Sequence, residues 1–257
     1  MKIKLCYLIF LFLLFFQNLL FAGIKIIPVK QELSLSQGQS FRSTMSISRA
    51  SESDFEAVKV ETKKWFELKE NKNIEINDWL KFDESEIVFK EGELSRLLSY
   101  TVSVPTNAVS EIMAMVSFTP IEKNQSQITQ VFSVPIYVFI KDTGRLAGEI
   151  AQFEAVKQKT GAIQCVLQIK NTGNIHFRPV GSFKIFKGKK EIEAFEMKSG
   201  RPVYPDKTRT FVGYGEQQLN DGFYKILIET YYNNNKQEIL HKKTYKLQVK
   251  GDLVKVK

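Results

Sequence analysis

The chain has 257 residues, a formal net charge of +9, and 12% aromatic residues. This length provides for two domains of about 100 residues each, or for one large β domain. Of the two cysteines, one lies in the apolar start of the chain, so Cys165 has no partner for an internal disulfide, and the spacing of the two cysteines and two histidines does not resemble a zinc site.

Residues 1–22 have the layout of a secretory signal peptide. Two lysines lie among the first four residues, residues 5–16 are almost entirely apolar, and Ala22 is a small residue at the expected cleavage point. This pattern predicts export to the periplasm or the cell surface. An uncleaved membrane anchor is the alternative, because the apolar stretch that ends at Ala22 has 18 residues, the lower limit for spanning a bilayer.

After residue 22, the apolar residues recur with a period near two, which is typical of half-buried β-strands. Segment 51–64 is charged and is predicted as either a short helix or an exposed edge. Strand candidates in this half are 24–29, 33–39, 41–47, 57–61, 65–68, 79–82, 87–89, 98–104, 112–118 and 131–140. Short strands separated by turn signals predict an antiparallel sandwich over residues 23–142.

Residues 143–148 are the expected linker, because they contain two glycines and mark a shift in charge. Residues 23–148 carry 15 Lys and Arg against 17 Asp and Glu, whereas residues 149–257 carry 20 against 11. Further strand candidates are 150–156, 162–170, 182–186, 191–197, 208–214, 223–232 and 239–249. The prediction is an all-β chain with two immunoglobulin-like sandwiches in tandem. The second covers residues 149–250, and a flexible tail follows at 251–257.

The sequence contains no nucleophile motif, phosphate-binding loop or metal-ligand spacing. Cys165 lies in an apolar run and is predicted as a buried hydrophobe. His176 is interpreted as a residue beside a turn, and Trp65 and Trp79 as core residues more than as a sugar-binding surface. We therefore expect a protein that is not an enzyme and that uses no cofactor and no metal.

Several features of the first half occur in a recognisable order. Pro28 and Lys30 follow an early strand, 102–105 ends a later strand with a proline, and 131–140 is the longest apolar strand. In this order of elements, the first half resembles the amino-terminal domain of periplasmic pilus chaperones. The second half, through segment 171–179, resembles immunoglobulin-like domains of bacterial envelope proteins.

The resemblance implies that strand 131–140 is added to the open sheet of a pilus-like subunit. It also implies two basic residues in a cleft that hold the subunit's terminal carboxylate. Lys30 loosely matches the first of these basic residues. The second is expected within strand 131–140, and Lys141 lies just past the end of that strand. Pro135 does not fit a donor strand well, because proline cannot donate a hydrogen bond. The alternative is that 131–140 is an ordinary core strand of the sandwich. The side chains that this resemblance directs at the subunit are Val134, Ile136, Val138 and Ile140.

The sequence thus predicts an exported, non-catalytic protein that binds envelope or pilus-like subunits or assists their assembly. The alternative is a structural or adhesive surface module that binds a partner protein, or an anionic wall polymer or lipid surface through the basic second half. Nucleic acid is not an expected partner. The first interpretation predicts that Lys30 and the edge of strand 131–140 are exposed. The second predicts a covered edge and lysines clustered on one face.

Overall fold

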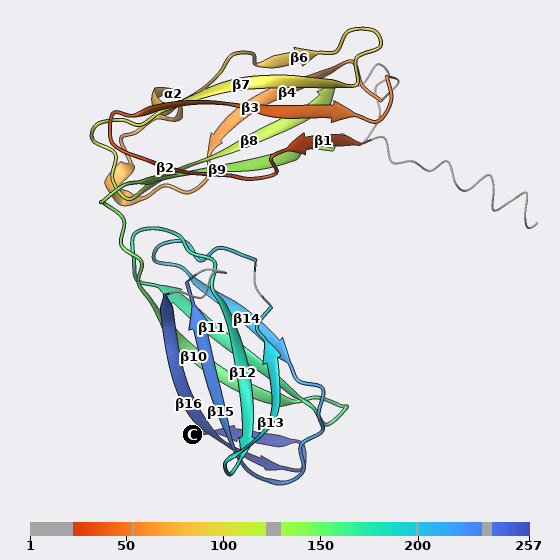
Figure 1. Cartoon of the computed structure of the whole chain (residues 1–257), viewed down its shortest axis with the longest axis vertical. Coiled ribbons are helices and arrows are strands. Elements are labelled where there is room, and N and C mark those ends of the chain that lie inside the picture. Colours follow the sequence, from red (N-terminus) through yellow and green to blue (C-terminus); the bar gives the residue numbers. More distant parts are fainter. Residues whose placement is uncertain (1–22, 53, 122–129, 199, 233–237) are drawn as a thin grey trace, which may run out of the picture.

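The computed structural model describes residues 23–52, 54–121, 130–198, 200–232 and 238–257. Two β-sandwiches follow one another along the chain (Figure 1), so the predicted all-β fold class is confirmed. The signal-peptide prediction concerns residues 1–22, which lie outside the described residues. Within the described ranges, no helix is long and apolar enough to cross a membrane.

The first sandwich has two sheets, with the strand orders β1-β3-β7-β5 and β2-β9-β8-β4-β6. Two helical turns, η2 (Lys69–Asn71) and α2 (Ile76–Trp79), lie between β4 and β5. The strands are β1 (Ile24–Ile27), β2 (Gln31–Leu35), β3 (Ser40–Arg49), β4 (Ala57–Lys64), β5 (Leu80–Phe82), β6 (Glu86–Val88), β7 (Ser95–Ser103), β8 (Glu111–Ile121) and β9 (Phe132–Ile140).

The chain passes from one sheet of the first sandwich to the other between β1 and β2. β1 pairs antiparallel with β3, whereas β2 pairs parallel with β9. The parallel register begins at Gln31 with Ile136 and ends at Leu35 with Ile140. β9 therefore lies between β2 and β8 along only part of its length, and its first residues extend beyond the start of β2.

Alternate side chains of the strands fill the space between the two sheets, and each large one stabilises the fold by about 1.5–3 kcal/mol. Trp79 lies in this core as predicted. Trp65, in contrast, is 48% exposed, and the strand candidate 65–68 is wrong. Trp65 is exposed and residues 65–68 form no strand because β4 ends at Lys64 and the chain then turns towards the second sandwich.

The second sandwich has a separate core and two sheets, with the orders β10-β11-β14 and β13-β12-β15-β16-β17. Cys165 is fully buried in this core, as predicted, and burial raises the pKa of its thiol. The strands are β10 (Gly148–Lys157), β11 (Ile163–Asn171), β12 (Val180–Lys187), β13 (Lys190–Glu196), β14 (Thr208–Tyr214), β15 (Gly222–Tyr231), β16 (Ile239–Lys250) and β17 (Leu253–Val256).

The end of the chain corrects one prediction. Residues 251–257, expected as a flexible tail, contain β17, which pairs antiparallel with the end of β16. Val254 and Val256 pack against the second core, and this apolar contact explains why the segment is held as an edge strand.

Candidate functional site

The two sandwiches meet where β9 ends and the chain passes into β10 (Figure 1). At the centre of this domain junction, the side chain of Glu111, at the start of β8, has no solvent exposure. The backbone N–H of His176, in the second sandwich, donates to Glu111 Oε2 at 2.9 Å, and His176 Nδ1 contacts Glu111 Oε1. A buried carboxyl group needs such partners, so this pair joins the two sandwiches.

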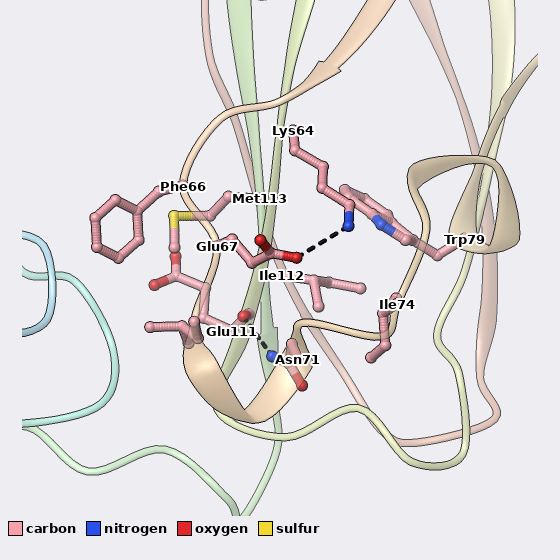
Figure 2. A pocket seen from close by; sticks show the side chains of 10 residues that line it. Lys64, Phe66, Glu67, Asn71, Ile74, Trp79, Glu111, Ile112 and Met113 are labelled. Atoms are coloured by element: carbon pink, nitrogen blue, oxygen red, sulfur yellow. Dashed lines mark hydrogen bonds and ion pairs between the residues drawn. The ribbon is translucent and has the colours of Figure 1, made fainter.

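The η2 turn positions Glu111. The side-chain amide of Asn71 donates to the carbonyl oxygens of Val109 at 2.7 Å and of Glu111 at 2.9 Å, and its Oδ1 accepts from the Val109 N–H at 3.1 Å. Figure 2 shows Asn71 beside the backbone of Glu111. Phe66 and Met113 lie near the carboxyl group of Glu111, away from Asn71. The cavity here has a volume of about 20 Å³, which is enough for one water molecule and too small for a ligand.

A turn in the second sandwich positions His176. The buried Asn171 amide donates to the carbonyl oxygens of Ile175 at 2.9 Å and of Val203 at 2.8 Å, and its Oδ1 accepts from the N–H of Gly173 at 2.8 Å. A Cβ at Gly173 would clash with the backbone of the linker. The linker is also held directly, because the N–H of Gly173 donates to the carbonyl oxygen of Ala147 at 3.0 Å.

Aromatic rings surround His176. The rings of Tyr137 and Phe139, both from β9, have centroids 4.3 and 5.2 Å from that of the imidazole. The hydroxyl oxygens of Tyr137 and Tyr204 are 3.0 Å apart, and Trp65 Nε1 donates to the Tyr204 hydroxyl at 2.6 Å. Burial, together with the hydrogen bond to Tyr204, raises the pKa of Tyr137. The outward side chains of β9 therefore form part of the domain junction.

Charged groups line the edge of the junction around Glu32 of β2. One carboxylate oxygen, Oε1, lies 2.9 Å from Lys30 Nζ, 3.4 Å from Arg178 Nε and 3.9 Å from His176 Nε2. Burial opposes ionisation of Glu32, but the hydrogen bond from Lys30 and the positive charges nearby hold its pKa below the usual value. Lys30, predicted for a subunit's carboxylate, is thus paired with a carboxylate of its own chain.

Two open hollows flank the junction, with volumes of about 540 and 210 Å³. Backbone and charged groups line much of the larger one, which lies between the segment after β4 and the turns of the second sandwich. Its lining residues are 66–70, 145, 172–174 and 205–207. The smaller one is bounded by Glu32, Phe139, His176 and Arg178 among others.

The predicted site residues lie in two different environments. Lys30 and Lys141 are exposed, Lys30 before β2 and Lys141 just after β9. The four predicted strand positions are all buried in the first core: Val134, Ile136, Val138 and Ile140. In the folded chain these side chains face the sandwich interior, and their contact with a subunit stays a prediction.

The backbone of β9 shows which of its groups face the open edge. The Ile140 N–H donates to Ser110, on the β8 side, whereas the Lys141 N–H donates to Leu35, on the β2 side. Because successive residues of an extended strand direct their backbone groups to opposite edges, the odd-numbered residues of β9 face β2. Residues 132–135 precede the β2 register, whose first pair, Gln31 with Ile136, brings the Gln31 N–H to the Pro135 carbonyl. Within the described chain, the backbone groups of Ser133 therefore face an edge without a partner strand.

In the described ranges, no three side chains among His, Cys, Asp and Glu gather as a metal site. No protein-family model matches this sequence, and neither does the sequence of a curated protein. The fold and the junction define an all-β protein of two sandwiches in direct contact.

Solved structures similar to this chain include several chaperones. The class 5 fimbriae chaperone CfaA is 16% identical, with a TM-score of 0.43, over 91% of this chain and 99% of that one. The Pseudomonas aeruginosa CupB2 chaperone is 8% identical, with a TM-score of 0.44, over 88% and 100%. The periplasmic chaperone SfaE is 9% identical, with a TM-score of 0.42, over 86% and 98%.

Proposed function

We propose that this chain is an exported, non-catalytic protein that binds an envelope or pilus-like subunit by β-strand addition along residues 132–135 of β9. The observation that supports this proposal is the incomplete cover of β9: β2 pairs only with Ile136 to Ile140. An extended segment of a subunit, added in line with β2, gains main-chain hydrogen bonds along this open segment.

The open segment offers a small set of backbone groups. Ser133 presents one N–H donor and one carbonyl acceptor, whereas Pro135 presents neither, since proline has no N–H and its carbonyl faces the N–H of Gln31. Val131, just before the strand, is 53% exposed. On the outward face, Pro135 pairs in register with Met115 of β8, and Met115 with Lys63 of β4. A subunit segment with a small apolar residue beside an acidic one complements this surface.

The domain junction supports the same proposal. Tyr137 follows the open segment on β9 by two residues, and its hydroxyl group contacts Tyr204 of the second sandwich. The second sandwich is therefore held in place beside β9 before a subunit binds. A pre-formed arrangement lowers the entropy lost on binding, so a fixed junction favours a subunit that contacts both sandwiches.

The test compares two substitutions at one position. Ser133→Pro removes the N–H donor from the open edge, whereas Ser133→Ala keeps it. Since one hydrogen bond contributes about 0.5–1.5 kcal/mol, we expect Ser133→Pro to weaken binding roughly two- to tenfold and Ser133→Ala to leave it unchanged. The binding partner is the subunit that co-purifies stoichiometrically with the protein from its own cell envelope, and affinity is measured by titration calorimetry.

Amide hydrogen exchange provides the second measurement. Subunit binding by strand addition slows the exchange of the Ser133 N–H. The thermal unfolding of the free Ser133→Pro variant is expected to stay that of the native chain, because this N–H has no partner among the described residues. Equal affinities of both variants, with unchanged exchange at residues 132–135, would exclude strand addition at this edge.

A further inference from the structure

Lysines lie side by side on the outer face of the five-stranded sheet of the second sandwich. Lys225 of β15 is the cross-strand partner of Lys246 of β16. Lys246 in turn exchanges both backbone hydrogen bonds with Lys257, at 3.0 and 2.9 Å. Like charges placed directly opposite each other destabilise a sheet, so this row is unfavourable for the isolated fold.

The next rows of the same face add large apolar side chains. Phe223 of β15 is opposite Gln248, and Gln248 is opposite Lys255 of β17. Leu253 is opposite Lys250. Phe223 is 71% exposed and Leu253 is 67% exposed. We call this surface the lysine face, and it consists of Phe223, Lys225, Lys246, Lys250, Leu253, Lys255 and Lys257.

The lysines of this face have no carboxylate partner among the described residues. Lys184 and Lys242, farther along the same sheet, both pair with Glu229, at 3.0 and 2.7 Å. In the neighbouring loops, Asp221 accepts a hydrogen bond from the N–H of Gly251 at 2.9 Å, and Asp252 lies in the turn between Lys250 and Leu253. The lysine face therefore presents an excess of positive charge around two exposed apolar side chains.

We propose that the lysine face binds the surface of a lipid bilayer that carries anionic headgroups. The ammonium groups pair with the headgroups, and Phe223 and Leu253 enter the boundary between headgroups and acyl chains. A soluble anionic polymer would use the lysines alone. The exposure of Phe223 and Leu253 beside them favours the bilayer, because it supplies both an anionic layer and an apolar one.

This binding is compatible with the proposed function and does not depend on it. The lysine face belongs to β15, β16 and β17 in the second sandwich, whereas the open segment of β9 belongs to the first (Figure 1). A chain bound to a bilayer through the lysine face leaves the open edge of β9 available for a subunit.

The experiment measures co-sedimentation of the protein, isolated from its own envelope, with vesicles of phosphatidylcholine alone or mixed with phosphatidylglycerol. The test variant is Lys225→Gln with Lys246→Gln and Lys255→Gln. The matched control loses the same charge at exposed lysines elsewhere, as Lys72→Gln with Lys81→Gln and Lys159→Gln. We expect the test variant to lose at least about tenfold in affinity for the anionic vesicles, and the control less than about twofold.

A second variant separates the bilayer from a polymer. Phe223→Ser is expected to weaken vesicle binding several-fold and to leave binding to dextran sulfate, a soluble anionic polymer, unchanged. Equal vesicle binding by the test variant and its control would overturn the proposal. So would tight binding to dextran sulfate combined with no effect of Phe223→Ser on vesicles, since the ligand would then be an anionic polymer.

Discussion

Glu32 is the residue at which charges from both sandwiches meet. Its carboxylate lies near Lys30 of its own sandwich and near Arg178 and His176 of the other. With 36% of its side chain exposed, solvent screens these interactions, and their contribution to stability is modest. Because Arg178 also lies over the ring of Tyr137 at 5.3 Å, Glu32 helps to orient a cation at the junction.

The lowered pKa of Glu32 predicts a pH dependence. The folded state binds the proton more weakly than the unfolded chain, so the contribution of Glu32 is present above its ordinary value of 4.5 and is lost as pH falls through the lower folded value. We expect Glu32→Gln to lower the thermal unfolding midpoint at about pH 7. This difference from the native chain is expected to shrink as the pH falls below 4.5 and to disappear below the lowered pKa of Glu32 in the folded state. Glu70→Gln, at an exposed carboxylate, is the control. A difference that persists or grows in acid would contradict the assignment.

The pairing of Glu111 with His176 was not predictable from the sequence. The two residues are 65 positions apart, and no local pattern connects residues at such a separation. One signal was present: Glu111 is a charged residue at the start of an almost wholly apolar strand, where a carboxyl group is buried and needs a partner. The sequence did indicate a turn before His176, and Asn171 and Gly173 form it.

β9 shows what periodicity can and cannot predict about one element. The apolar pattern predicted a strand over 131–140, and β9 occupies Phe132 to Ile140. The strand candidate 33–39 overlaps β2, but the parallel pairing of β2 with β9 was not predicted. Periodicity reveals a strand but not its partner, and these two strands are far apart in the sequence. At β17, the two valines that contact the core are too few to produce a periodic signal.

Pro135 limits how readily β9 accepts another strand. Proline at an edge withholds one donor and is a common protection against unwanted strand pairing. We expect Pro135→Val to supply that N–H and to strengthen subunit binding about two- to tenfold, or to cause self-association of the free protein. Titration calorimetry and sedimentation velocity measure these effects.

Pro105→Val, in the loop after β7, is the control for removing a proline elsewhere. It is expected to change neither binding nor self-association. Unchanged behaviour of Pro135→Val in both measurements would show that this edge of β9 is not a pairing surface.

At the scale of the whole molecule, two independent cores are joined by a small junction. The apolar clusters of the two sandwiches are separate, and their relative placement depends on side chains such as Trp65, Tyr137, His176 and Tyr204. Tandem sandwiches were predictable from strand rhythm. Their arrangement was not, because the junction residues come from segments that are distant in the sequence.

Glu111 provides the means to test how firmly the sandwiches are held. Glu111→Leu leaves the His176 backbone N–H and imidazole without their buried partner, whereas Glu111→Gln keeps one acceptor oxygen and replaces the other with an amide NH2 group. Loss of a buried polar partner destabilises by about 1–3 kcal/mol, and by more where a charge is left unpaired. Because each core is intact without this pair, we expect the loss to appear as freedom of the junction before either sandwich unfolds.

Small-angle X-ray scattering measures this freedom as a larger radius of gyration and a broader distance distribution for Glu111→Leu, with Glu111→Gln closer to the native chain. Hydrogen exchange reports the same change locally as faster exchange of the His176 N–H, while the Ile136 N–H in the first core keeps its protection. If scattering and exchange were native-like in Glu111→Leu, the aromatic contacts among Trp65, Tyr137 and Tyr204 would be sufficient to hold the junction. If Ile136 lost protection together with His176, Glu111 would be a residue on which the first sandwich itself depends.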